Sequence, residues 1–167
     1  MKPQDFVKAY LQDARNTEAK TGVSAIAILA QAALESGWGS YAPGNMFFGQ
    51  KDFDGLNGNE QLCRTVEYSR RADLKFPVIH SINPVVINGI RYFKYDIEDY
   101  FRKYESPEDC FIDHVNFLIK NTRYAQAMLV KSDPIAFLTE LAKAGYASAP
   151  NYAATMTAMV KSINLFL

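Results

Sequence analysis

The sequence predicts a mainly helical α+β domain, and three observations lead to this expectation. Both ends of the chain carry apolar residues at helical spacing, whereas residues 41–95 are rich in Gly and Asn and contain β-branched runs. The 167 residues are enough for one compact domain with a real core. The 49% hydrophobic content, without repeats or low-complexity segments, is typical of a globular protein. We therefore expect residues 1–167 to form a single domain, with a small β lobe at about residues 41–95 between helical parts.

The first predicted helix covers about residues 3–20. Phe6, Tyr10 and Ala14 recur on one of its faces, and this face is expected to enter the core. Gly22 suits the position just beyond a helix end, so the helix is expected to stop there. A second helix follows after a very short connection.

The second predicted helix ends in an acidic residue. Ser24 is its expected N-cap, and Gly37 suits the left-handed position just past its end. Glu35 then lies in the last turn, where the negative end of the helix dipole opposes ionisation, and apolar surroundings would raise the pKa further. A carboxyl group that keeps its proton near neutral pH is what a general acid for glycoside cleavage requires. The alternative is a solvated surface glutamate, which is common at helix ends.

The β lobe is predicted from short β-branched runs. Residues 64–68 indicate one strand, and residues 85–87 and 90–93 indicate a hairpin around the turn Asn88-Gly89. After about Tyr95 the chain is expected to return to helix.

Three further helices are predicted in the last third of the chain. Ser106 and Asp133 are expected N-caps because each is followed by Pro, which favours the first helical position, and Pro150 is expected to start the final helix. Phe111 and Val115 have the spacing of a core-facing side of the first of these helices.

Charge and termini exclude several classes of protein. Eighteen basic residues balance eighteen acidic ones, without a basic face, which disfavours nucleic acid as a partner. No apolar run follows the N-terminus, so we expect no secretory signal, and residues 24–34 are too short to span a bilayer. Export as part of a longer protein, or by a non-classical, phage or specialised secretion route, is expected. We expect a monomer.

The few cysteines and histidines predict no metal site. Cys63 and Cys110 are expected to be two separate, partly buried thiols. His80 and His114 lie far apart without metal-ligand spacing, and both are expected to be structural or exposed. No metal and no cofactor are predicted.

Four segments resemble one enzyme family. Residues 30–39 (Ala-Gln-Ala-Ala-Leu-Glu-Ser-Gly-Trp-Gly) and the following residues 42–51 resemble the signature of the endo-β-N-acetylglucosaminidases. This family, glycoside hydrolase family 73 (mannosyl-glycoprotein endo-β-N-acetylglucosaminidase-like), includes bacterial autolysins and peptidoglycan hydrolases. Residues 65–68 resemble its Thr-x-Glu-Tyr strand, and residues 144–153 resemble its Ala-Gly-Tyr-Ala-Thr-Asp-Pro-x-Tyr-Ala motif. These anchors occur in the family's order.

The resemblance implies a lysozyme-like fold in which the β lobe forms one wall of a substrate cleft. It implies that Glu35 is the catalytic acid, Glu67 the second catalytic residue and Tyr146 a tyrosine of the active site. Thr65 and Glu67 are predicted to point to one face of a strand because strand side chains alternate. The alternatives are a polar pair on an outer strand face and, for Tyr146, a core tyrosine.

Five further side chains are expected to bind substrate. Trp38, Phe47 and Phe48 can offer ring faces to a sugar, and Trp38 is equally suited to pack under Glu35. Gln31 lies one turn before Glu35, within reach of its carboxylate. Tyr152 belongs to the last matching motif. Asp96, Glu98, Asp99 and Glu105 are interpreted as solvated charges.

Two departures from the family pattern are visible. Ala149 stands where the family has Asp, and the loss of that cap is expected to weaken the last helix by about 0.5–2 kcal/mol. Residues 68–91 form an insert that is expected to enlarge the β lobe.

The sequence therefore predicts a peptidoglycan hydrolase that cleaves the β-1,4 bond on the reducing side of N-acetylglucosamine, acting in the cell wall or periplasm. Glu67 or the substrate's own acetamido group would assist the acid. A muramidase on the same polymer remains an alternative, because one fold can support both. A non-catalytic glycan-binding or assembly module is a second alternative.

Overall fold

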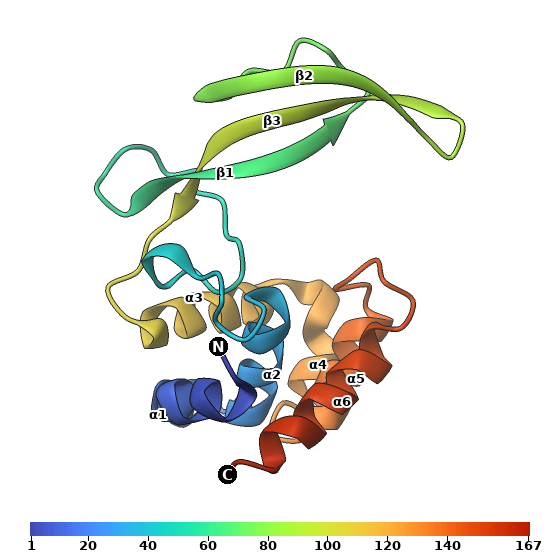
Figure 1. Ribbon diagram of the computed structural model, residues 1–167. Helices are drawn as coiled ribbons and strands as arrows, with labels where there is room; N and C mark the ends of the chain where they lie inside the picture. The colour runs from blue at the N-terminus through green and yellow to red at the C-terminus, as the bar shows by residue number, and fades with distance from the viewer. The chain divides into compact units, whose positions relative to one another are not determined.

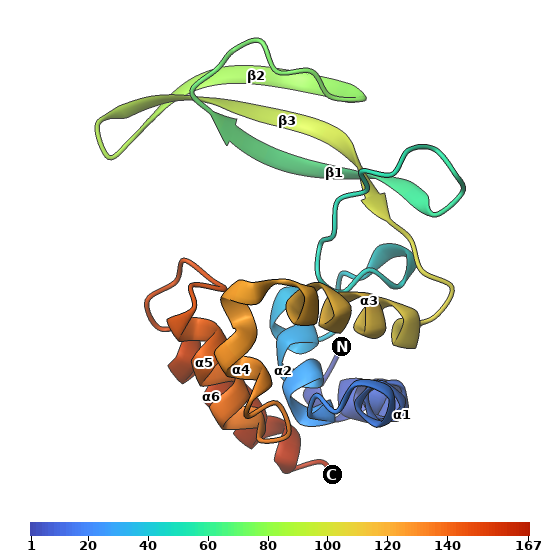
Figure 2. The same ribbon diagram turned by 180° about the vertical axis from the view of Figure 1, so that it is seen from behind.

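The computed structural model describes residues 1–167, which fall into two compact units. The helical unit comprises residues 1–48 and 104–167, and the β unit comprises residues 49–103. Figures 1 and 2 show helices in the first unit and a small sheet in the second. The predicted mainly helical α+β class is confirmed.

The helical unit contains six α-helices and two 3₁₀ turns. Their bounds are α1 (Pro3–Thr21), α2 (Ala25–Glu35), η1 (Pro43–Asn45), α3 (Pro107–Lys120), η2 (Thr122–Tyr124), α4 (Ala125–Met128), α5 (Pro134–Lys143) and α6 (Tyr152–Asn164). None of these helices combines the length and apolarity needed to cross a bilayer.

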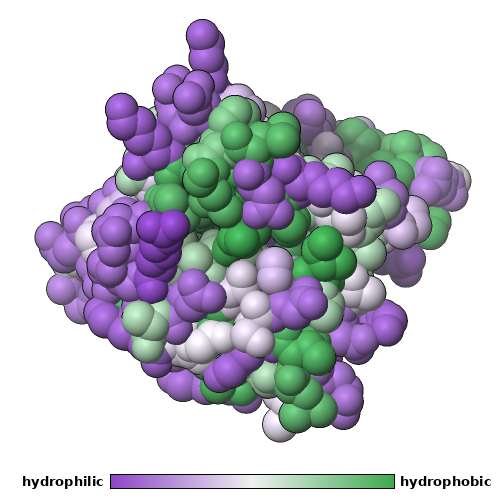
Figure 3. Space-filling model, turned by 90° about the horizontal axis from the view of Figure 1, so that it is seen from below, coloured by the Kyte–Doolittle hydropathy of each residue, from purple (hydrophilic) through white to green (hydrophobic).

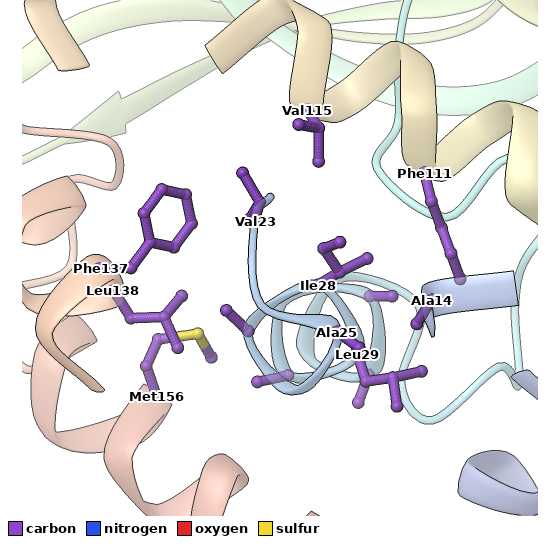
Figure 4. Close-up of a cluster of buried hydrophobic side chains, with 14 of the residues drawn as sticks. Ala14, Val23, Ala25, Ile28, Leu29, Phe111, Val115, Phe137, Leu138 and Met156 are labelled. Carbon is purple, nitrogen blue, oxygen red and sulfur yellow. The ribbon is translucent and has the colours of Figure 1, made fainter. Parts of the chain in front are cut away.

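Helix α2 forms the centre of the helical unit. It is rich in Ala and is buried on all sides, as expected for a helix that is apolar around its whole circumference. Figure 4 shows α2 end-on, with Ile28 and Leu29 between Phe111 of α3 and the side chains of α5 and α6, among them Met156. The small Ala side chains let neighbouring helices approach closely, so α2 is packed in the core as far as Ala33 and reaches the surface at Leu34 and Glu35.

Two of the three predicted N-cap residues make the expected capping hydrogen bonds. Ser106 accepts a hydrogen bond from the Asp109 amide, and Asp133 accepts bonds from two amides of α5, as predicted. Ser24 occupies the N-cap position of α2, but its side chain forms no capping bond.

The expectation about Ala149 was wrong. Helix α6 begins at Tyr152 with Asn151 as the N-cap residue, and Asn151 makes no side-chain capping bond. Ala149 lies two residues before the cap, where its carbonyl accepts the Tyr152 amide. A side chain at position 149 is therefore not the N-cap of this helix.

The β unit is a three-stranded antiparallel sheet in the order β1-β3-β2, built from β1 (Glu60–Ser69), β2 (Val78–Ile87) and β3 (Ile90–Arg102). The predicted hairpin turn is confirmed: Asn88 and Gly89 both have positive φ, 50° and 77°. Strand β2 lies within residues 68–91, the predicted insert.

The β lobe continues beyond its predicted end at about Tyr95, because β3 extends to Arg102. The predicted return to helix follows at Pro107, after the N-cap Ser106. This strand is the centre of the sheet and pairs with both neighbours. Its odd-numbered residues Tyr95, Ile97 and Phe101 are buried, and Asp99 lies on the same face. The charged residues Asp96 and Glu98 lie on the other face of this long strand.

Both cysteines are buried and unbonded to each other, which confirms the prediction of separate thiols. Burial raises the pKa of Cys110 to about 12. The surface mixes polar and apolar side chains: Figure 3 shows hydrophobic areas bordered by hydrophilic ones, and the exposed apolar residues include Leu129, Leu165 and Leu167.

Candidate functional site

Glu35 is the last residue of α2, as predicted, and a two-bond cap fixes the chain beyond it. The Trp38 amide donates to the Ala33 carbonyl (2.7 Å), and the Gly37 amide donates to the Leu34 carbonyl (3.4 Å). This pair of bonds is a Schellman motif, with Gly37 in the left-handed conformation (φ 57°). The end of α2 is therefore held by the backbone directly beside Glu35.

The Gly-Trp-Gly turn continues in the left-handed region for three residues. Trp38 and Gly39 follow Gly37 with φ values of 57° and 71°, so even the tryptophan adopts a conformation that costs energy for a bulky residue. The Ser36 hydroxyl ties the turn to the helix, because it accepts the Gly39 amide at 2.8 Å and donates to the Ala32 carbonyl. The Trp38 ring packs edge-on against Phe6 of α1 at 5.6 Å.

The setting of Glu35 favours its protonated form. Glu35 as a residue is solvent-exposed, yet its carboxyl group is partly desolvated, and this desolvation raises its pKa. No basic side chain forms an ion pair with it. The predicted direction of the pKa shift is confirmed.

Three tyrosines form a cluster in the helical unit, and two of them, Tyr146 and Tyr152, interact electrostatically with Glu35. The ring of Tyr146 lies 5.6 Å from that of Tyr152 and 6.1 Å from that of Tyr124. Burial raises the pKa values of Tyr146 and Tyr152, and the negative charge of Glu35 raises both further. The two hydroxyl groups therefore keep their protons and lie within the electrostatic reach of the Glu35 carboxylate.

Arg123 holds the loop that carries Tyr146. Its guanidinium donates to the carbonyls of Ala144 (2.7 Å) and Gly145 (2.9 Å), at the end of α5. Gly145 takes the left-handed conformation, and the Tyr146 amide then bonds back to the Leu141 carbonyl. A bidentate arginine thus fixes the backbone immediately before the tyrosine.

A buried polar network lies behind the tyrosines. The Gln31 side-chain amide donates to the Tyr152 hydroxyl at 3.0 Å, and the Gln31 carbonyl oxygen lies 3.2 Å from Nε2 of His114. Phe48 stacks on the His114 ring at 3.8 Å with a 13° interplanar angle. Tyr146 meets the same imidazole edge-on at 6.1 Å.

The β unit places Glu67 in a charged cluster. Lys51 Nζ lies 2.7 Å from Glu67 Oε1 and 3.0 Å from Asp99 Oδ2. Desolvation lowers the pKa of Lys51, but its hydrogen bonds to the two carboxylates outweigh this and raise it. One ammonium group therefore bridges two carboxylates on neighbouring strands.

The predicted orientation of the β1 side chains agrees with the sheet register. Thr65 pairs with Ile97 and Glu67 pairs with Tyr95, so the Thr65 and Glu67 side chains share the face that carries the buried residues of β3. Phe76 packs edge-on against Tyr95 at 5.5 Å on the same unit and lies 6.0 Å from the Lys51 ammonium.

Burial divides the five expected substrate-binding residues. Trp38 and Phe48 are partly exposed, whereas Gln31, Phe47 and Tyr152 are only 1, 2 and 4% exposed. Phe47 packs among aromatic core residues, and both ends of the Gln31 amide are engaged by other side chains. Direct sugar contact does not fit this burial. The expected contact between Gln31 and the Glu35 carboxylate is replaced by bonds to Tyr152 and His114.

Sequence reasoning missed several residues beside the candidate site. His114 was expected to be structural or exposed, and the structure places it in the network behind Tyr152. Asp99 was interpreted as a solvated charge but bonds Lys51, whereas Asp96 and Glu98 pair with Arg64 and His80. The spacing of Asp99 along β3, in the same alternation as the buried Tyr95 and Ile97, could have indicated its side of the sheet. No group of three or more His, Cys, Asp or Glu side chains is arranged to hold a metal ion.

Comparison with protein families gives one match over most of the chain. The model described as mannosyl-glycoprotein endo-beta-N-acetylglucosaminidase matches residues 11–165. The match includes Glu35, Glu67 and Tyr146, and it extends across residues of both compact units.

The relatives are similar in sequence and in structure. A peptidoglycan hydrolase FlgJ from Vibrio parahaemolyticus is 30% identical over 90% of this chain and 44% of its own length. The Salmonella typhimurium FlgJ is 32% identical over 96% of this chain and 46% of its own length. The chain thus spans less than half of these relatives. The solved C-terminally truncated glycoside hydrolase domain of Salmonella typhimurium FlgJ is 30% identical, with a TM-score of 0.71, covering 98% of this chain and 99% of that one.

Proposed function

Because the chain belongs to the glucosaminidase family of glycoside hydrolases, we propose that it cleaves peptidoglycan at the β-1,4 bond on the reducing side of N-acetylglucosamine. The observation that carries the proposal is Glu35, a carboxyl group whose pKa is raised by desolvation at the fixed end of a buried helix. The names of the relatives, peptidoglycan hydrolases, support the choice of polymer. The two compact units act in this proposal as one glucosaminidase domain, since the family match extends across both.

Glu35 is the general acid of the proposed reaction. Its proton passes to the glycosidic oxygen as the bond from that oxygen to the anomeric carbon breaks, and the departing sugar leaves as an alcohol. A carboxyl group with a raised pKa still holds this proton near neutral pH. The proton that the attacking water loses, directly or through Glu67 and solvent, restores the Glu35 carboxyl group.

Glu67 or the acetamido oxygen of the substrate acts at the anomeric carbon. In the first case the ionised Glu67 removes a proton from the attacking water, and Lys51 is the positive group that accompanies this carboxylate. In the second case the acetamido oxygen attacks the anomeric carbon first and forms a cyclic oxazolinium ion. Water then opens this ring and gives its proton to the Glu35 carboxylate, and the charged cluster at Lys51 serves to orient the sugar.

Tyr146 is the proposed positioning group for substrate or water, because its protonated hydroxyl lies in the electrostatic reach of Glu35. Trp38 and Phe48 are the proposed sugar-contacting rings, since both keep part of their surface exposed. Gln31 and Tyr152 support the site through their mutual hydrogen bond, and Phe47 supports it through the core.

The proposed partner is the glycan strand of peptidoglycan. The chain binds it as a monomer, in the cell wall or periplasm. Export as part of a longer protein, or by a non-classical, phage or specialised route, would bring the chain there. The balanced charge of 18 basic and 18 acidic residues supports a carbohydrate rather than a nucleic acid as the partner.

The test is mass spectrometry of borohydride-reduced products from purified peptidoglycan, with the native chain, Glu35→Gln and Glu105→Gln in parallel. Glu105 is an exposed glutamate in the same unit and serves as the matched control. Reduced N-acetylglucosamine ends from the native chain and the control, but not from Glu35→Gln, are expected. Reduced N-acetylmuramic acid ends would instead assign a muramidase. A chain that binds the polymer without releasing products would be a glycan-binding module.

A further inference from the structure

His114 is a buried titratable residue that the proposed mechanism does not use. It lies on α3, is 3% exposed, and contacts three different segments of the helical unit. Phe48 covers one face of its ring, Tyr146 meets it edge-on, and Gln31 of α2 bonds its Nε2 atom. A histidine enclosed in this way is fixed in position, and its protonation state decides what it can donate.

The imidazole of His114 is neutral and carries its proton on Nε2. Desolvation lowers its pKa to about 3, so the ring has one N–H donor and one acceptor nitrogen at neutral pH. The atom facing Nε2 is the carbonyl oxygen of Gln31, which can only accept. Nε2 therefore donates to Gln31.

The direction of this bond also determines how Gln31 bonds to Tyr152. With its oxygen held by His114, the Gln31 amide turns its NH₂ group to the Tyr152 hydroxyl oxygen, 3.0 Å away. The tyrosine accepts this bond, so its own proton is left for another acceptor. Gln31 precedes Glu35 by one turn on the same face of α2, so its bond brings the Tyr152 hydroxyl to the side of the helix that carries Glu35. Glu35 and Tyr124 are the titratable groups that act on Tyr152, and of these only Glu35 becomes an anion in the proposed reaction.

We propose that His114 and Gln31 are positioning residues that fix Tyr152 as a hydrogen-bond donor toward the Glu35 carboxylate as that group gives up its proton. The inference rests on the proposed function, because it assigns Glu35 as the acid. A carboxylate formed in a desolvated site is unstable without a donor, and a fixed hydroxyl supplies one without rearrangement of solvent. Neither His114 nor Gln31 touches the substrate in this scheme; both act through Tyr152.

The first test reads the tautomer of His114 directly. In ¹⁵N-labelled protein, the nitrogen shifts of His114 are expected to show a neutral ring with the proton on Nε2 between pH 5 and 8. The chain has two histidines, so His80→Gln, in the β unit, assigns the remaining signal to His114. A proton on Nδ1, or a ring that becomes charged in this range, would reverse the hydrogen-bond direction and overturn the inference.

The second test compares His114→Leu, His114→Gln and Tyr152→Phe on purified peptidoglycan. His114→Leu is expected to lower kcat about tenfold with little change in KM, since one neutral hydrogen bond is lost. His114→Gln places an amide nitrogen near the Nε2 position and is expected to recover most of the rate. In a Tyr152→Phe background, His114→Leu should lower kcat no further, because the hydroxyl that His114 orients through Gln31 is already absent.

The pH profile separates positioning from simple packing. Loss of the Tyr152 donor leaves the Glu35 carboxylate less stabilised, so the pKa of Glu35 rises and the basic limb of kcat/KM moves to higher pH. An unmoved limb in Tyr152→Phe, or additive losses in the double variant, would contradict the inference. Should His114→Leu fail to fold, Gln31→Met removes the amide that joins His114 to Tyr152 and tests the same hydrogen bonds. Failure of the proposed function is distinguishable, because the native chain would then release no reduced N-acetylglucosamine ends, or Glu35→Gln would release them as the native chain does.

Discussion

The two candidate carboxylates sit in opposite electrostatic surroundings. Glu35 ends a buried helix and has no cationic partner, and the desolvation of its carboxyl group favours the protonated form. Glu67 lies on a sheet against the Lys51 ammonium, which is the partner of an ionised carboxylate. The same side-chain chemistry is thus directed to two roles by what lies next to it, and residue type alone does not reveal this.

The substitution expected to lower kcat most is Glu35→Gln. Replacing the acid by its neutral isostere should lower kcat by about 10²–10⁴-fold, the range for losing general acid catalysis. Rates on purified peptidoglycan, measured beside Glu105→Gln, check the prediction. A loss of less than tenfold would show that proton donation by this carboxyl group is not the main contribution.

The next effect concerns the charged cluster. Lys51→Met leaves Glu67 and Asp99 without their shared cation and should reduce kcat about tenfold. Its effect on stability should stay within about 1 kcal/mol, because the three side chains are partly exposed. The matched control is Arg64→Met. Arg64 lies on β1 like Glu67 but on the opposite face, and the substitution removes its ion pair with Asp96. An unchanged kcat would remove Glu67 from the mechanism and leave the acetamido route.

The turn after Glu35 gives a third comparison, between its two glycines. Gly37→Ala meets no neighbouring atom within 4 Å, so its expected cost is the left-handed conformation alone, about 1 kcal/mol. Gly39→Ala also places a Cβ atom 3.2 Å from the Phe6 ring and should cost more. Chemical unfolding of both variants measures the difference. Equal losses would mean that the Phe6 ring moves aside.

The raised pKa of Glu35 also predicts how stability depends on pH. The group has a higher pKa in the folded chain than its ordinary value of 4.5, so ionisation opposes folding. This cost is absent below the unfolded pKa, accumulates as the pH rises through the folded pKa, and is complete above it. Glu35→Gln should therefore match the native chain in unfolding temperature near pH 3 and exceed it near pH 7. A native chain that is as stable as the variant at pH 7 would contradict desolvation as the cause.

The smallest effect is expected at Ala149. Ala149→Asp restores the family residue, but position 149 lies two residues before the N-cap, so stability should change by less than about 0.5 kcal/mol. The control is Asn151→Asp at the cap itself, where a charged acceptor near the start of α6 should stabilise by more. A larger gain from Ala149→Asp than from Asn151→Asp would show that the loop carries its own capping bond.

The helices and the hairpin turn could be predicted from the sequence because the caps and turn residues that determine them lie within a few positions of one another. Ser106 and Asp133 cap helices through amides two or three positions away, and Asn88-Gly89 makes its turn alone. The length of β3 was missed because its pairing with β1 and β2 depends on residues far along the chain. The start of α6 was missed because Pro150 favours a helix start without requiring one.

The candidate site divides in the same way. Glu35 could be identified from a helix end and a turn, which are adjacent in sequence. The contact of Gln31 with His114 joins residues 83 positions apart, and that with Tyr152 joins residues 121 positions apart. Burial of Phe47 follows from the packing of several helices, so no short pattern could have distinguished it from its neighbour Phe48, which remains partly exposed.

The enclosure of α2 has a consequence for the rate of amide exchange and for the entropy of the reaction. The buried residues of α2, Ala25 to Ala33, exchange their amides only through large-scale opening and should be among the slowest-exchanging parts of the chain. The bonds beyond Glu35 tie its backbone to this slow segment, so that backbone is ordered when the chain folds. A long, flexible glycan strand loses freedom on binding, whereas the backbone that carries the acid has already lost its own.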